Sequence, residues 1–218
     1  MASWDHRVGN RRVITNQHLI PYVDAEKAPP ETAAALRTLP FERNIFKLLA
    51  NSPCTFIPFM KLLSSCWSEN TSIRASEWQL IVLRTASLLD APYEYDVNEP
   101  VAKILGFDTE AKLAAIRAGD LSNREWFTKR HQLIGRMVEQ LVQQQKVDES
   151  TMIEAREMLG NAAALEVLMI HGVYGLLARL MNSLKIDFDP EIPGLEDMLR
   201  KYNENAIEKE RQLAAQDA

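Results

Sequence analysis

Two long, strongly apolar segments with helical spacing limit the folds open to this chain. The first runs from Ser76 to Asp90 and the second from Ala162 to about Leu184, and each is apolar around most of its circumference. A helix of that kind is stable only when neighbouring helices cover most of its sides. We therefore expect these two segments at the centre of the fold, with amphipathic helices packed around them.

The rest of the chain also has helical spacing, interrupted by proline, glycine and capping residues. Further helices are expected over residues 30–39, 41–50, 55–67, 93–105, 109–119, 122–142, 148–160 and 195–215, with an arm over residues 1–18 and a linker over 186–194. No segment has the alternating pattern of a strand, and 218 residues suffice for one sizeable core. The predicted fold class is all-α, a single-domain helical bundle.

Charge and residue usage exclude several function classes. The 25 basic and 30 acidic side chains give a net charge of -5, which disfavours nucleic acid as a partner. No segment approaches the roughly 18 consecutive apolar residues of a membrane span, and the N-terminus does not resemble a secretory signal, so we expect no membrane association and a cytoplasmic location. Two cysteines and four histidines are too few for a disulfide scaffold or an evident metal site. Nucleotide-binding and hydrolase motifs are absent, and we expect neither a metal nor an organic cofactor.

Arg84 is a charged residue inside the first apolar segment. An unpaired buried charge costs several kcal/mol, so Arg84 needs a partner or a cavity. Glu77 lies seven residues earlier on the same helical face, which makes an internal ion pair the expected arrangement. The alternative is that Arg84 binds a carboxylate of a substrate.

Polar side chains follow the break at Ala91-Pro92. Glu94 and Asn98 share one face of the next helix, and the phenols of Tyr93 and Tyr95 flank Glu94. Enclosure among apolar helices would raise the pKa of Glu94 toward neutrality, where proton transfer is efficient. The alternative is a solvated first helical turn, where the helix dipole favours a carboxylate in any case.

His171 lies in the second apolar segment, and Tyr174 follows it three residues later on the same helix. Histidine titrates near neutral pH, so this pair is the candidate for a second proton-transfer group. A core histidine with satisfied hydrogen bonds is the alternative.

The order of these segments resembles that of carboxymuconolactone decarboxylase-like proteins, a superfamily that also contains the alkyl hydroperoxidase D proteins. The resemblance covers residues 19–187 and rests on IPYVD (20–24), NIFKLLANSP (44–53), EWQLIVLR (77–84), YEY (93–95) and HGVYGLLAR (171–179). It implies an all-α domain over 19–187 that forms homo-oligomers, as trimers, hexamers or dimers, with active sites near subunit contacts. The linker and C-terminal helix over 188–218 lie outside it.

The resemblance also indicates which branch of the superfamily this chain is closer to. The redox branch uses two cysteines followed by a histidine, and the corresponding positions here are Ala91, Glu94 and Asn98. Without either thiol, peroxidase activity is not expected. The decarboxylase-like branch also has a histidine where this chain has Asn98. Asparagine can orient a carbonyl but cannot shuttle a proton, so His171 is the candidate to replace that histidine.

The residues and the resemblance together predict a cofactor-free lyase or isomerase that acts on a small molecule beside a carbonyl. The reaction would be decarboxylation of a β-keto acid or lactone, or a related isomerisation, dehydration or cyclisation in a specialised pathway. Glu94 would be the general acid or base, with His171 and Tyr174 as the opposing partner. The residues expected to bind substrate are Tyr93, Tyr95, Asn98 and Arg84. The alternative is a non-catalytic oligomeric binding or scaffold protein.

Overall fold

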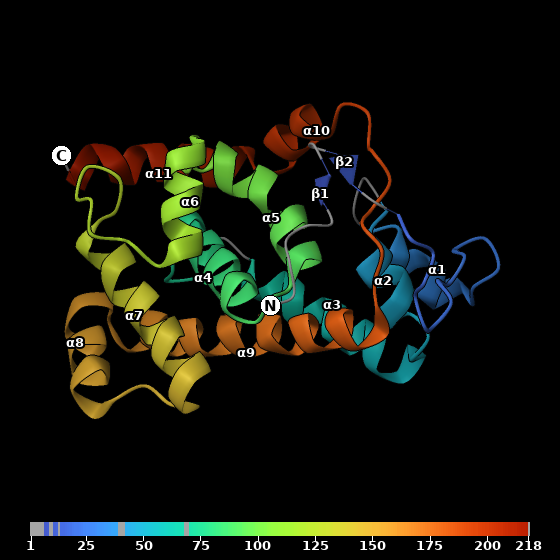
Figure 1. Cartoon of the computed structure of the whole chain (residues 1–218), viewed down its shortest axis with the longest axis horizontal. Helices are drawn as coiled ribbons and strands as arrows, with labels where there is room; N and C mark the ends of the chain where they lie inside the picture. The colour runs from blue at the N-terminus through green and yellow to red at the C-terminus, as the bar shows by residue number, and fades with distance from the viewer. Residues whose placement is uncertain (1–6, 9–10, 13, 39–41, 68–69, 218) are drawn as a thin grey trace.

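A computed structural model describes residues 7–8, 11–12, 14–38, 42–67 and 70–217, and nearly all of its regular structure is helical (Figure 1). The elements in chain order are β1 (Arg7–Val8), β2 (Arg11–Arg12), α1 (Pro30–Leu36), α2 (Asn44–Leu49), α3 (Pro53–Cys66), α4 (Ala75–Leu88), α5 (Pro92–Ile104), α6 (Glu110–Ala118), α7 (Lys129–Gln144), α8 (Glu149–Leu159), α9 (Asn161–Leu184), α10 (Leu195–Tyr202) and α11 (Glu204–Asp217). The predicted all-α fold class is confirmed. The one departure is the antiparallel pairing of β1 with β2, two residues each, within the predicted arm.

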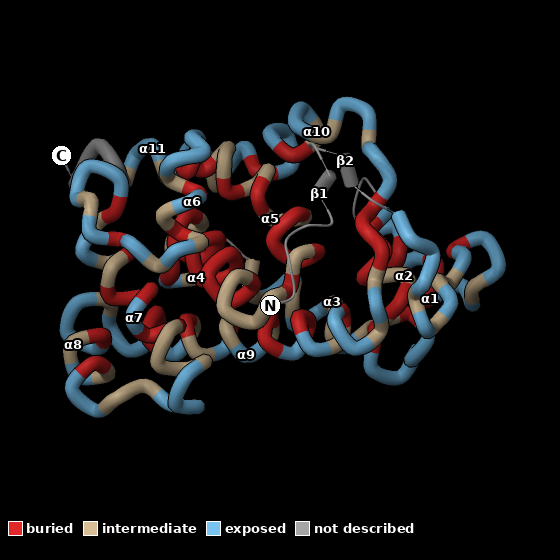
Figure 2. The backbone as a smooth tube through the Cα atoms, in the orientation of Figure 1, coloured by how far each residue is buried: buried red, intermediate tan, exposed pale blue. Residues whose placement is uncertain are grey.

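Helix α4 is the central element. It packs against α5, α6, α7 and α9, and every side chain from Ser76 to Ala86 is buried. Figure 2 shows buried residues in α4, in the adjacent part of α5 and in α2, while Figure 1 shows α9 along one side and α10 with α11 along the other. The central position predicted for the first apolar segment is therefore confirmed.

The break between α4 and α5 directs Glu94 into the core. Asp90 has a φ of 51° after the end of α4, and Pro92 occupies the first turn of α5, where its missing N–H leaves no hydrogen bond unmade. Tyr93 and Glu94 follow within that turn. Because α5 packs on α4 and α9, the side chains of this turn are buried instead of solvated.

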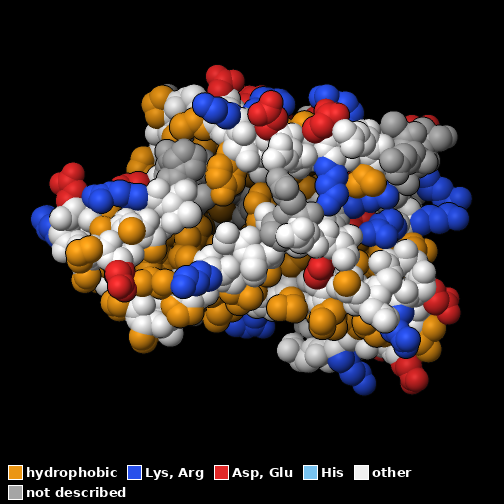
Figure 3. All heavy atoms as spheres, turned by 180° about the vertical axis from the view of Figure 1, so that it is seen from behind, with side chains coloured by type: hydrophobic (Ala, Val, Ile, Leu, Met, Phe, Trp, Pro, Cys, Tyr) orange, Lys and Arg blue, Asp and Glu red, His pale blue; other side chains and the backbone are white. Residues whose placement is uncertain are grey.

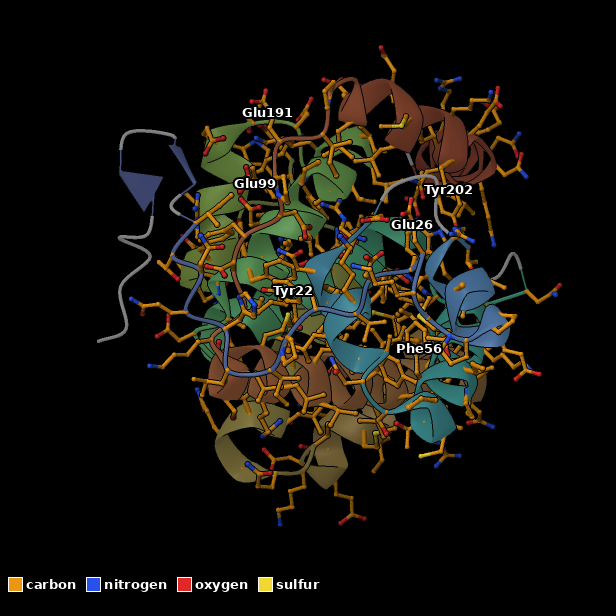
Figure 4. All side chains as sticks on the ribbon, turned by 90° about the vertical axis from the view of Figure 1, so that its right-hand side faces the viewer. Tyr22, Glu26, Phe56, Glu99, Glu191 and Tyr202 are labelled. Atoms are coloured by element: carbon orange, nitrogen blue, oxygen red, sulfur yellow. The ribbon has the colours of Figure 1, made fainter. Side chains whose placement is uncertain are left out.

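The N-terminal helices enclose a second, smaller core. Phe56 of α3 lies in it with Ala25, Leu36 and Ala50. Figure 4, viewed from this end of the molecule, shows Phe56 among the N-terminal helices and Tyr202 of α10 above it. Helix α10 packs on α5, as Figure 1 shows.

The predicted helix boundaries differ most from the structure in two places. The single helix predicted over 195–215 is divided into α10 and α11 at Asn203, whose Nδ2 donates to the carbonyl of Leu199 at 2.7 Å. Such side-chain bonds compete with helix continuation. Helix α7 begins at Lys129, later than predicted, because Thr128 Oγ1 accepts the backbone N–H of His131 at 3.2 Å and caps it there. The predicted start of the second helix at residue 41 lies outside the described residues.

The segment over residues 186–194, predicted to be a linker, is anchored to the fold. Asp187 accepts hydrogen bonds from the backbone N–H and the hydroxyl of Thr15, both at 2.8 Å, and its other oxygen lies 3.0 Å from His18 Nδ1. Asp189 is 1% exposed and pairs with Arg43 at 2.9 Å. These contacts also hold residues 15–18 of the predicted arm against the same chain.

Helix α9 is, within the described part of the chain, the one helix long and apolar enough to cross a membrane by length and composition. One of its faces is buried against α4, α7 and α8. The central position predicted for the second apolar segment is therefore correct for this face alone, because Leu165, Met169 and Leu176 on the outer face are exposed.

Candidate functional site

A cavity of about 750 Å³ lies among α4, α5 and α9 on one side and α2, α3 and α10 on the other. Figure 3 shows this face of the molecule hollowed, with hydrophobic side chains around the hollow. The apolar wall includes Ile45, Phe46, Trp67, Val97, Leu177 and Met181. The volume and the apolar lining are typical of sites that enclose a small organic molecule.

Glu94 is the buried acid of this cavity. Its side chain is 1% exposed, and neither carboxyl oxygen has a hydrogen-bond partner among the described residues. Burial raises the pKa of the Glu94 carboxyl well above its usual range, because the ionised form loses its hydration. An unpaired buried polar group costs about 1–3 kcal/mol of stability, and such perturbed groups are concentrated at functional sites. Of the two arrangements that the sequence left open for Glu94, the structure shows the enclosed one.

Tyr174 of α9 lies close to Glu94 in the cavity wall. Burial raises the pKa of the Tyr174 phenol, and the charge of Glu94 adds to this effect. Trp78 Nε1 donates to the Tyr174 hydroxyl at 3.3 Å, and the Trp78 ring packs edge-on against both Tyr174 and Trp67. The hydroxyl proton of Tyr174 has no acceptor among the described residues, so a ligand can receive it.

Tyr93 and Asn98 also line the cavity, but each is engaged elsewhere. The Tyr93 hydroxyl donates to Asp189 at 2.9 Å and accepts the backbone N–H of Ile45 at 3.2 Å. Asn98 Nδ2 donates to the backbone carbonyl of Glu94 at 2.8 Å. Tyr93 therefore presents its ring to the cavity, and its hydroxyl binds the protein.

Arg84 lies outside the cavity wall, at the contact of α4 with α6 and α7. Its guanidinium donates to Glu139 at 2.9 and 3.2 Å and to the carbonyls of Ile116 and Arg117. The predicted pairing with Glu77 is wrong: the partner of Arg84 is Glu139. The structure thus shows Arg84 in an internal ion pair. Arg84 does not line the cavity that contains Glu94.

Tyr95 and His171 are also absent from the cavity wall. The Tyr95 hydroxyl is buried and donates to the carbonyl of Leu113 at 3.3 Å. His171 Nδ1 lies 3.0 Å from Thr85 Oγ1, and burial, together with the charge of Arg179, lowers the pKa of His171. Residues three apart on a helix point about 60° apart, so Tyr174 can face the cavity while His171 faces α4. The structure therefore does not bring His171 together with Glu94.

Two contributions to the cavity lie outside the sequence-based predictions. Gln79 of α4 is 2% exposed, and its Oε1 is buried without a hydrogen-bond partner in the described part of the molecule. Its signal in the sequence is an amide between Trp78 and Leu80 in an apolar helix. Leu199 and Tyr202 of α10 cover the cavity from the C-terminal region, where the sequence shows only an apolar stripe.

Metal and thiol chemistry have no evident site in the described residues. They contain no group of three or more His, Cys, Asp or Glu side chains that could hold a metal ion. Cys54 is exposed on α3, and Cys66, whose pKa is raised by burial, lines a neighbouring hollow of about 640 Å³. Neither thiol is among the described residues that line the cavity containing Glu94.

No family model matches the sequence, and no curated protein matches it. The structure is similar to the crystal structure of the apo form of the debrominase Bmp8, with a TM-score of 0.66 and 15% identity over 87% of this chain and 97% of that chain. It is equally similar, at a TM-score of 0.66 and 14% identity, to a cysteine-to-alanine variant of Bmp8 in complex with 2,3,4-tribromopyrrole, over 89% of this chain and 100% of that one. The likeness shows a shared all-helical fold, in agreement with the fold that the sequence resemblance implies.

Proposed function

We propose that this protein binds a small, largely apolar organic molecule in the cavity and transfers a proton beside a carbonyl of that molecule through Glu94. The observation that carries the proposal is the Glu94 carboxyl itself, which is buried, unpaired and raised in pKa. A carboxyl held neutral in an apolar site can donate its proton as a general acid and, once ionised, act as a strong general base. The Bmp8 complex contains a small halogenated pyrrole, which is consistent with a small-molecule enzyme of this fold.

Tyr174 is the proposed partner of Glu94 in this chemistry. When a proton leaves the carbon beside a carbonyl, or carbon dioxide leaves a β-keto acid, negative charge develops on the carbonyl oxygen. The Tyr174 hydroxyl, whose proton has no acceptor among the described residues, can donate a hydrogen bond to that oxygen, and a donor in a water-poor site stabilises such charge strongly. Glu94 then supplies or removes the proton at carbon. Decarboxylation, isomerisation, dehydration and cyclisation all share this step, and decarboxylation stays one prediction among them.

Glu94→Gln tests the proposal. We expect this variant to lose about 10²–10⁴-fold in rate, the usual contribution of a general acid or base. Exchange of the hydrogens beside the carbonyl in D₂O, followed by NMR over a panel of ketones, β-keto acids and lactones, detects the shared step whatever the final product. Carbon dioxide release is measured in parallel. Glu191→Gln, at an exposed position, is the matched control. Equal rates for wild type and Glu94→Gln, or no exchange with any compound of the panel, would contradict the proposal.

A non-catalytic binding protein is the second candidate, and one observation favours it. The titratable side chains that line the cavity are Arg43, Lys61, Tyr93, Glu94, Tyr174 and Tyr202. None of these is a histidine, so no imidazole stands beside Glu94 in the described wall. Saturable binding of a compound without hydrogen exchange or turnover would favour this second function.

Self-association, predicted from the resemblance, is proposed to use the outer face of α9. Leu165, Met169 and Leu176 are 56%, 45% and 47% exposed, and Gly172 lies between them on the same stripe. Exposed apolar stripes of this kind are typical of protein interfaces.

We expect wild type to run as a dimer, trimer or hexamer in size-exclusion chromatography with light scattering, and Leu176→Lys to run near 24.8 kDa. Leu62→Lys, at an exposed leucine of α3, should leave the mass unchanged; a monomeric wild type would contradict the prediction.

A further inference from the structure

The cavity contains a second unpaired polar group besides Glu94. Gln79 projects from α4, is 2% exposed, and has no hydrogen bond to the described residues, although its Oε1 is fully buried. Buried amides in proteins are nearly always hydrogen-bonded, so a free one in a cavity wall points to a partner that is not part of the protein. Gln79 and Glu94 are the cavity residues that have such buried, unpartnered atoms in the described structure.

Gln79, Glu94 and Tyr174 come from three helices, α4, α5 and α9, and all three line this cavity. Gln79 is adjacent in sequence to Trp78, which hydrogen-bonds the Tyr174 hydroxyl at 3.3 Å, and the Tyr174 phenol lies close enough to Glu94 to be affected by its charge. An amide can both donate and accept, and so can a neutral carboxylic acid, whereas the free phenol proton can only be donated. The cavity wall therefore offers both donors and acceptors, within a largely aromatic and aliphatic surface.

We propose that this cavity recognises uncharged, mostly apolar molecules whose buried end has a donor N–H or O–H beside an acceptor carbonyl, as in a lactam or an enolised β-dicarbonyl compound, and that Gln79 determines this specificity. The inference rests on the proposed function and defines the substrate class of the same site. Gln79 pairs with one group of the ligand, while Glu94 and Tyr174 pair with the other.

The charges around the cavity favour an uncharged ligand end over an ionic one. Arg43, one of the two cationic residues in the described wall, is paired with Asp189 at 2.9 Å, and the other, Lys61, is exposed. An anion seated beside Gln79 would therefore lack a cation deep in the cavity, and burial without a counter-ion is costly. A cationic amine is the competing class, because it could take the Glu94 proton and pair with the carboxylate.

Equilibrium binding to a matched set of probes tests the specificity. The probes are the bicyclic lactam carbostyril, its N-methyl derivative, which lacks the donor, naphthalene, which lacks both groups, and naphthylmethylamine, which is cationic. Binding is followed by calorimetry and by fluorescence of the cavity tryptophans. We expect wild type to bind carbostyril about tenfold or more tightly than N-methylcarbostyril, because the methylated ligand leaves Gln79 unpaired.

Gln79→Met and Gln79→Leu keep the volume of the side chain and remove its hydrogen bonds. We expect both variants to reduce the preference for carbostyril to about threefold or less, with naphthalene binding unchanged. Both should unfold at or above the wild-type temperature, since the amide makes no hydrogen bond in the described structure. A preference that survives in both variants, tighter binding of naphthylmethylamine than of carbostyril, or no saturable binding of carbostyril would overturn the inference.

The readout also separates this inference from the proposed function. The lactam preference is measured without turnover, so a protein that shows the preference but catalyses no hydrogen exchange refutes only the proposed function. Exchange that depends on Glu94 but proceeds equally in Gln79→Met and wild type, with no lactam preference, refutes only the inference.

Discussion

Asp189→Asn is expected to lower the free energy of unfolding by about 3–5 kcal/mol, the usual cost of removing one partner of a buried ion pair. Asp189 is 1% exposed and accepts hydrogen bonds from Arg43 at 2.9 Å, from the backbone N–H of Asn44 at 2.7 Å and from the Tyr93 hydroxyl at 2.9 Å. The asparagine keeps the shape but removes the charge that compensates Arg43. Since a typical domain has about 5–15 kcal/mol of stability in total, this loss is large.

Urea denaturation of matched variants measures the effect. Tyr93→Phe removes one of the three donors to Asp189 and also the acceptor of the Ile45 N–H, so it should cost about 2 kcal/mol, the net value of two ordinary hydrogen bonds. Asp197→Asn, at an exposed position of α10, should change the midpoint little. If Asp189→Asn unfolds at the same urea concentration as Asp197→Asn, the segment over 186–194 does not anchor the fold.

The positions of the helices were predictable from the sequence where nearby residues determine them. The apolar circumference of residues 76–90 requires burial, and α4 is accordingly the central helix. Local signals compete, however, where two capping residues are close together: Ser122 and Thr128 both suit a helix start, and only the packed structure selects Thr128. The anchoring of the 186–194 segment was not predictable, because Asp187 and Asp189 bind residues that lie more than a hundred positions away in sequence.

The site was predictable only in part, for a related reason. Glu94 and Tyr174 stand on helices whose buried faces are evident from the sequence, and both line the cavity. Placing His171 and Arg84 requires the rotation of α9 and α4 against their neighbours, which is set by partners such as Thr85 and Glu139. Gln79 stands out because its buried Oε1 has no hydrogen-bond partner among the described residues. A sequence pattern cannot predict that a buried group lacks a partner.

The stability of the protein is expected to depend on pH through Glu94, with a sign opposite to that of an ordinary surface carboxylate. Burial raises the pKa of Glu94 in the folded protein above the ordinary value of 4.5, so between these two pKa values the folded state holds a proton that the unfolded state has lost. The contribution of Glu94 to the free energy of unfolding therefore has its full value below about pH 4.5 and decreases as the pH rises. The loss is about 1.4 kcal/mol for each pH unit within that window.

Glu94→Gln removes the titrating group and keeps its size, so the variant should gain stability relative to wild type as the pH rises from about 5 to about 8. Urea denaturation at several pH values measures this difference directly. His171, whose pKa is lowered by burial, has the opposite sign, since it loses stability as the pH falls, but it is present in both proteins and cancels in the difference. In Glu191→Gln, at an exposed position, the difference from wild type should not vary with pH. A constant difference between Glu94→Gln and wild type would mean that Glu94 ionises in the folded protein as it does in water, and the acid–base role proposed for it would lose its physical basis.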